Sequence, residues 1–189
     1  MNEKDLRVRR TKESIINAFI ELRAKKPLEK ITVKELADLA YINKATFYTH
    51  YHDIYDLEEQ LEIETIQSLL KNIPHPEYIL TNSKEGTIEM ITAFSAQSQL
   101  LDILFSGSRQ SHFHNLLESE IKSHIYEIYP KLKNNLKAEV ILTILIQGNF
   151  YAYRNYAGKN FDEVTEILGD ISEYINHKYL TGSTLQVEN

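Results

Sequence analysis

The sequence has 189 residues and no cysteine, which excludes disulfide scaffolds, zinc–thiolate sites, iron–sulfur clusters and cysteine nucleophiles. Hydrophobic residues make up 42% of it and charged residues 25%, a balance typical of a globular protein with a sizeable core. No apolar run is long enough for a membrane span and the first residues are polar, so we expect a cytoplasmic protein without a signal peptide or a membrane partner.

The formal net charge of −6 is unevenly distributed along the chain. Residues 1–50 contain 11 Lys and Arg against 7 Asp and Glu, a net charge of +4, whereas residues 51–189 contain 10 against 20, a net charge of −10. Such an asymmetry suggests a module that binds a polyanion, joined to a body that repels it. A basic, solvated N-terminus without a partner is the simpler alternative.

The chain before residue 41 is predicted to contain two helices. Thr11 is expected to cap the first, whose apolar side chains recur at spacings of three and four residues. A capping box opens the second, because the Thr32 hydroxyl can accept from the amide of Glu35 while the Glu35 side chain reaches back. We expect this second helix to end near Ala40.

A third predicted helix, over 44–51, follows a two-residue turn. Asn43 is expected to cap it, and Phe47 and Tyr51 fall on one face at a spacing of four residues. Asp53 then caps a fourth, longer helix. Two short helices joined by a tight turn are the arrangement that places a recognition helix in the major groove of DNA.

The other face of the third helix is suited to contact with DNA. Once the aromatic pair is turned inward, this face offers one cation, one methyl group and several hydrogen-bonding groups: Lys44, Ala45, Thr46, Tyr48 and Thr49. The N-terminal end of the second helix, at Thr32, adds backbone amides that can bind a phosphate.

Residues 72–86 are rich in Pro, Asn, Ser and Gly, and we place a domain boundary there. Beyond it the pattern predicts four further helices, the first with a break near 96–98 and the second ended by Pro130: about 86–105, 109–129, 136–157 and 162–180. No segment alternates in the manner of a strand. We therefore predict an all-α fold.

The two short helices resemble the helix-turn-helix of the TetR family of bacterial transcription factors. The resemblance rests on TVKELADLA at 32–40 followed by INKATFYTHY at 42–51, and its aromatic-rich ending is the most distinctive part. It extends over about residues 7–68. It implies a three-helix, helix-turn-helix DNA-binding domain over 7–68 and a C-terminal helical bundle over 69–181 for effector binding and dimerisation.

The resemblance also implies which residues contact DNA. The family's contacts carry over to Arg9, Arg10, Thr32, Lys44, Ala45, Thr46, Tyr48, Thr49 and His50. Two positions depart from the family. Tyr41 stands where the family usually has glycine, often with a positive φ, so we expect strain there. Ile54 stands where the family often has a lysine on phosphate, a contact that His52 could partly replace.

The C-terminal half resembles the last two helices of a TetR subgroup common in Gram-positive bacteria. The matching residues are QGNFYAYR at 147–154, then Gly158 and FDEV at 161–164. In the family these helices pack against a second subunit, which implies a homodimer through about 136–157 and 162–180. Apolar residues on more than one face of 136–157 agree with such burial, and a central helix in a monomer is the alternative.

Aromatic residues gather in the same half of the chain. By resemblance they imply a pocket for a small-molecule effector, and the candidate ligand-binding residues are Phe94, Phe105, His112, Tyr126, Gln147 and Tyr151. Pockets between bundle helices are mostly apolar with a few polar groups. The alternative is that these aromatic side chains form the core.

Nothing in the sequence indicates catalysis, a metal or a cofactor. Nucleophile elbows, phosphate loops and dinucleotide fingerprints are all absent from the sequence. The histidine pairs at 50 and 52 and at 112 and 114 are two residues apart, so on a helix they point about 200° apart and cannot share a metal. We therefore expect no enzyme.

The leading hypothesis is a ligand-responsive transcriptional regulator, most often a repressor in this family. It would bind a palindromic, double-stranded DNA operator as a homodimer. The alternative is a DNA-tethered interaction protein of the co-activator type, whose C-terminal domain binds a protein partner instead of a small molecule. A third hypothesis is an enzyme that has reused the bundle.

Overall fold

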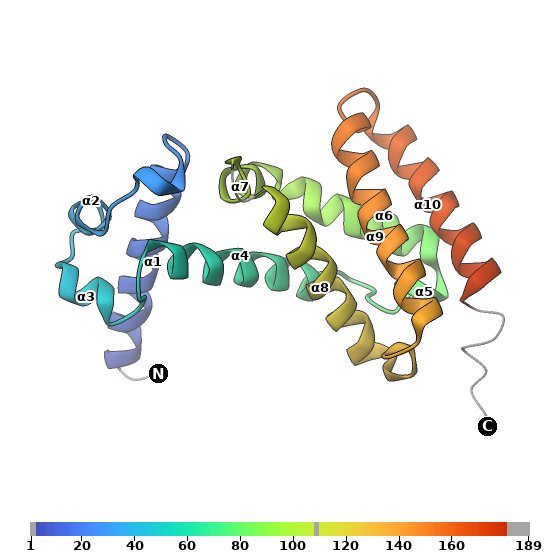
Figure 1. Cartoon of the computed structure of the whole chain (residues 1–189), viewed down its shortest axis with the longest axis horizontal. Helices are drawn as coiled ribbons and strands as arrows, with labels where there is room; N and C mark the ends of the chain where they lie inside the picture. The colour runs from blue at the N-terminus through green and yellow to red at the C-terminus, as the bar shows by residue number, and fades with distance from the viewer. Residues whose placement is uncertain (1–2, 108–109, 181–189) are drawn as a thin grey trace. The chain divides into compact units, whose positions relative to one another are not determined.

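A computed structural model describes residues 3–107 and 110–180 (Figure 1). These residues form helices and turns, and no strand occurs among them. The prediction of an all-α fold is confirmed. Within the same ranges, no helix combines the length and the apolar character needed to cross a lipid bilayer.

The chain divides into two compact units. The first comprises the chain up to Thr65 together with Ser98–Phe113, and the second comprises Ile66–Gln97 and the chain from His114 onward. The sequence predicts a division after residue 68, with all of 69–181 in the second domain. Ser98–Phe113 instead belongs with the first unit, because α7 (Ser98–Leu104) packs on α1 (Glu3–Arg23).

The core of the first unit is built from α1, α2 (Val33–Leu39), α3 (Lys44–Tyr48), the start of α4 (Ile54–Lys71) and α7. Each helix supplies apolar side chains that solvent does not reach: Ile15, Phe19, Leu36, Phe47, Leu57 and Leu104. Ile15 and Phe19 of α1 show the four-residue spacing that predicts an amphipathic helix. Because Leu36 and Phe47 are buried in this core, the opposite faces of α2 and α3 are turned to solvent.

Two predicted helix bounds in the first unit are wrong. α1 begins at Glu3, and Thr11 lies inside it with its Oγ1 donating to the carbonyl of Arg7 at 2.9 Å, so Thr11 caps nothing. α3 ends at Tyr48, not at 51. The reason is that the amides of Thr49 and His50 donate to carbonyls three residues back, which tightens the chain into a turn.

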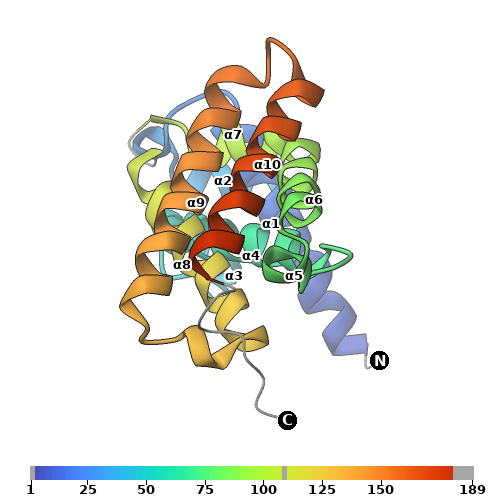
Figure 2. The ribbon, with the colours of Figure 1, turned by 90° about the vertical axis from the view of Figure 1, so that its right-hand side faces the viewer.

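The second unit is built from α5 (Tyr78–Thr81), α6 (Ser83–Ala96), the larger part of α8 (Gln110–Ile128), α9 (Leu136–Tyr156) and α10 (Phe161–Tyr179). α10 lies between α6 and α9 (Figure 2). The two helices α5 and α6 approach so closely that a Cβ at Gly86 would lie 2.7 Å from the backbone of Tyr78. Glycine is therefore required at this crossing.

The predicted bounds of the second half fit the structure closely. The break near 96–98 is present, since α6 ends at Ala96 and α7 begins at Ser98. Asn135 and Asn160 cap α9 and α10 by accepting from backbone amides three residues on. The short helix α5 was not predicted. Arg109, the predicted start of α8, and residue 181, the predicted end of the second domain, lie outside the described residues.

Candidate functional site

The turn between α2 and α3 has a specific hydrogen-bond pattern. The amide of Ile42 donates to the carbonyl of Ala37 at 3.0 Å, and the amide of Tyr41 donates to that of Asp38 at 3.3 Å. This pair of bonds is the Schellman motif, whose outer residue usually is a glycine in the left-handed region. Tyr41 occupies that place with φ of 55°, so the expected strain is present, and its side chain is 95% exposed.

Side-chain caps fix the beginning of both helices. Thr32 Oγ1 accepts from the amide of Glu35 at 3.2 Å. The second half of the predicted capping box is missing, because the Glu35 carboxylate forms an ion pair with Lys26 instead. Asn43 Oδ1 accepts from both the amide (2.7 Å) and the hydroxyl (2.9 Å) of Thr46. The start of α3 is thus held at a defined orientation.

The aromatic side of α3 is buried and its other side faces solvent. Phe47 is fully buried and its ring lies 5.8 Å from that of Tyr51, as their spacing predicts. Tyr48 is 56% exposed. The remaining candidate DNA-binding residues of this segment are exposed or half-buried: Lys44, Ala45, Thr46, Thr49 and His50.

The groups around α3 differ in the charge they could bring to a phosphate. Lys44, Arg9 and Arg10 are exposed, and Arg9 forms an ion pair of 2.9 Å with Glu13. Burial, and to a smaller extent the nearby Lys12 ammonium, lowers the pKa of His50. His50 is therefore mainly neutral at pH 7, and the permanent positive charge on this surface comes from lysine and arginine.

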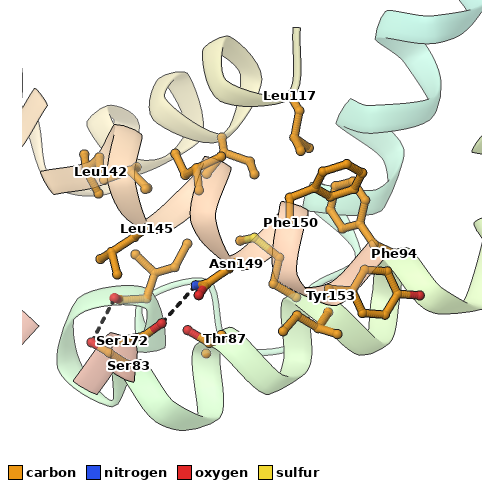
Figure 3. Close-up of a pocket in the computed structure, with 17 residues that line it drawn as sticks. Ser83, Thr87, Phe94, Leu117, Leu142, Leu145, Asn149, Phe150, Tyr153 and Ser172 are labelled. Carbon is orange, nitrogen blue, oxygen red and sulfur yellow. Dashed lines mark hydrogen bonds between the residues drawn. The ribbon is translucent and has the colours of Figure 1, made fainter. Parts of the chain in front are cut away.

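A cavity lies inside the second unit, between α6, α8, α9 and α10 (Figure 3). Its volume is about 80 Å³, counted as the space that the centres of water molecules can occupy. Most of its wall is aliphatic or aromatic, and Phe94, Leu117 and Phe150 belong to it. The described residues that line it include no Asp, Glu, Lys, Arg or His.

Small polar side chains form one part of the wall. Asn149 Nδ2 donates to Ser172 Oγ at 2.9 Å, and Ser172 Oγ donates to the carbonyl of Leu168 at 2.8 Å. Ser83 Oγ donates to the carbonyl of Ile79 at 3.0 Å. The buried Asn176 donates to the Ser83 hydroxyl oxygen. These residues escaped the sequence analysis, although one signal was present: polar side chains at 165, 172 and 176 share the buried face of α10.

The cavity contains only one of the six predicted ligand-binding residues, Phe94. Phe105 and His112 belong to the first unit, where Phe105 packs on Phe113 and His112 Nε2 lies 3.5 Å from the Glu62 carboxylate. These two residues therefore lie apart from the cavity, which sequence spacing could not show because it does not reveal which unit a helix face joins.

The other three predicted ligand-binding residues lie on or between α8 and α9. Tyr126 donates its hydroxyl to Glu139 at 2.9 Å, and Gln147 donates to Glu118 at 2.8 Å. Tyr151 is 66% exposed. The first two residues therefore join the two helices to each other, and the third points to solvent.

The carboxylate of Glu118 is the centre of this contact between α8 and α9. It lies 2.7 Å from the Lys122 ammonium and accepts from the Thr143 hydroxyl at 2.5 Å. Partial burial opposes its ionisation. The hydrogen bonds from Gln147, Lys122 and Thr143 outweigh that effect and lower the pKa of Glu118 to about 2.

Comparisons with protein-family models and with curated proteins found no match for this chain.

Proposed function

We propose that the protein is a ligand-responsive transcriptional regulator that binds a palindromic operator as a homodimer, most simply as a repressor. The proposal combines the resemblance of residues 7–68 to the TetR family with the surface of α3. Its main support is that burial of Phe47 and Tyr51 leaves Lys44 and Tyr48 of α3, and Thr49 directly after it, exposed to solvent. Side-chain caps fix the beginning of both α2 and α3. A cation, a phenol and a hydroxyl on one short helix suit phosphates and base edges.

In this proposal α2 and α3 are the helix-turn-helix, and the first unit is the DNA-binding part. Arg9 and Arg10 on the exposed side of α1 would add contacts to the adjacent backbone or minor groove. Thr32 would contact phosphate at the beginning of α2. His50, being mainly neutral, would contribute hydrogen bonding and not charge.

The last two helices are the proposed dimer interface. Apolar side chains recur at spacings of three, four or seven residues on the exposed faces of both helices, where a second copy would cover them: Leu136, Val140, Ile144 and Tyr151 on α9, and Ile167, Ile171 and Tyr174 on α10. A dimer would present two copies of α3 to half-sites about one turn of DNA apart, roughly 34–36 Å, or a multiple of it.

The cavity in the second unit is the proposed effector site. An effector can change DNA affinity only by as much as its own affinity differs between the DNA-competent and DNA-incompetent states. A largely apolar space next to the proposed dimer helices suits such a role, because filling it would alter how α6, α9 and α10 pack.

Selection of binding sites from a random pool of double-stranded DNA, using the full-length protein, tests the proposal. We expect an inverted repeat. Lys44→Ala should weaken binding and reduce the slope of log K against log salt by about one ion pair, whereas Lys133→Ala in the second unit should change neither. Recovery of no preferred sequence, or an unchanged slope in Lys44→Ala, would contradict the proposal.

A further inference from the structure

The geometry points to a defined chemical class for the ligand of the cavity: a small, uncharged, mostly apolar molecule with one hydrogen-bonding group, such as a phenol or an aromatic N–H compound. Carboxylates and phosphates are excluded. The regulatory meaning of this inference rests on the proposed function, but the binding itself does not.

The absence of charge in the wall excludes ions. None of the described lining residues is titratable near neutral pH, and the polar atoms present belong to hydroxyl and amide groups. Moving a carboxylate or phosphate from water into such a space without a cation costs several kcal/mol even after relaxation. A neutral molecule avoids this cost.

The hydrogen bonds already made in the wall show which of its polar atoms remain for a ligand. A serine hydroxyl has one proton, and Ser172 and Ser83 give theirs to the carbonyls of Leu168 and Ile79. Ser172 Oγ must therefore act as the acceptor toward Asn149, which fixes the Asn149 amide with Nδ2 toward Ser172 and Oδ1 turned away from it. Acceptors therefore remain for a ligand at Asn149 Oδ1 and at the serine oxygens, and the Thr87 and Tyr153 hydroxyls of the wall can donate as well as accept.

The arrangement of the wall also orients the ligand. In Figure 3, Ser83 and Ser172 lie on one side of Asn149, and Phe94 and Phe150 lie on the other. An aromatic ligand would place its ring against these two rings, where offset or edge-to-face contacts are favourable. Its hydrogen-bonding group would point to Asn149 and Ser172.

The volume limits the size of the ligand. One water molecule needs about 10–15 Å³ of such space. The 80 Å³ available therefore corresponds to roughly five to eight water-sized groups, close to a substituted benzene.

Four probes of nearly equal shape test this class on the full-length protein without DNA, by calorimetric titration at pH 7. p-Cresol donates a hydrogen bond, 4-methylanisole only accepts, p-xylene does neither, and 4-methylbenzoate is an anion. We expect p-cresol to bind about tenfold more tightly than p-xylene, 4-methylanisole to bind with an affinity between the two, and 4-methylbenzoate not to bind. Equal affinity for p-cresol and p-xylene, or preferred binding of 4-methylbenzoate, would overturn the inference.

Variants locate the binding. Asn149→Leu should abolish the preference for p-cresol over p-xylene, whereas Asn155→Leu, the same change at an exposed position of α9, should preserve it. Should Asn149→Leu not fold, Ser172→Ala provides the second test and should reduce the preference. A variant series that leaves the preference unchanged would overturn the assignment.

The two proposals can fail independently. A protein that selects a DNA sequence but prefers 4-methylbenzoate would contradict this inference alone, and one that binds p-cresol but no DNA would contradict the proposed function alone.

Discussion

Arg23 Nε donates a 2.7 Å hydrogen bond to Glu58 Oε1, and both side chains are buried. Arg23 Nη2 also donates to the carbonyl of Leu104 at 3.0 Å, so one guanidinium joins α1, α4 and the end of α7. Glu58→Ala should lower the free energy of unfolding by about 3–5 kcal/mol, because it leaves a buried cation without this partner. Urea denaturation measures the loss. Glu59→Ala, at an exposed position next to it, is the control, and an equal loss there would contradict the prediction.

Tyr41→Gly should stabilise the protein by about 1 kcal/mol. Tyr41 has a left-handed backbone conformation, which costs a residue with a Cβ about 1–2 kcal/mol. Glycine avoids this cost, but its greater conformational freedom in the unfolded chain offsets part of the gain. Tyr41→Ala keeps the Cβ and should give no such gain. Thermal unfolding of the two variants compares them directly, and a glycine variant no more stable than the alanine variant would show that the turn is not strained.

The caps and the buried aromatic pair could be predicted because they depend on neighbours within a few residues. Asn43 and Asp53 precede helices and accept from amides three residues on, which is a local property of the chain. The prediction that Thr11 caps a helix is wrong for the same reason, because a threonine before an apolar helix and a threonine inside one can have the same local sequence. Here the Thr11 hydroxyl donates to the carbonyl of Arg7 inside the helix.

The ligand site could not be predicted in the same way, because a cavity depends on which faces of distant helices meet. Phe94 and Phe105 are both buried aromatic residues, yet Phe94 lines the cavity and Phe105 lies in the first unit. What separates them is the break between α6 and α7. Local periodicity indicates that a side chain is buried. Only the tertiary arrangement shows which other residues it packs against.

Acid should destabilise the protein partly through Glu118. The pKa of this carboxyl is about 2 in the folded protein and near 4.5 in the unfolded chain, so its contribution is complete above pH 4.5 and is lost as the pH falls toward 2. Glu118→Gln should therefore show a smaller fall in the free energy of unfolding between pH 5 and pH 3 than the unsubstituted protein. Urea denaturation at each pH gives the values. Glu127→Gln, at an exposed position of α8, should leave the fall unchanged, and an equal effect of both substitutions would remove Glu118 as the cause.

The exposed apolar faces of α9 and α10 can be tested by a single charge. Ile144 on α9 is 56% exposed in a single chain, and Ile171 on α10 is also exposed, at 45%. A homodimer formed through these helices would bury Ile144, so Ile144→Glu should shift the protein from dimer to monomer in analytical ultracentrifugation, since a carboxylate would have to be desolvated without a partner. The affinity of this variant for an inverted-repeat DNA should also fall, because two separate monomers would then have to bind the two half-sites independently. Ser119→Glu, at an exposed position of α8, should keep the dimer. A dimer of unchanged stability in Ile144→Glu would place the interface on another surface.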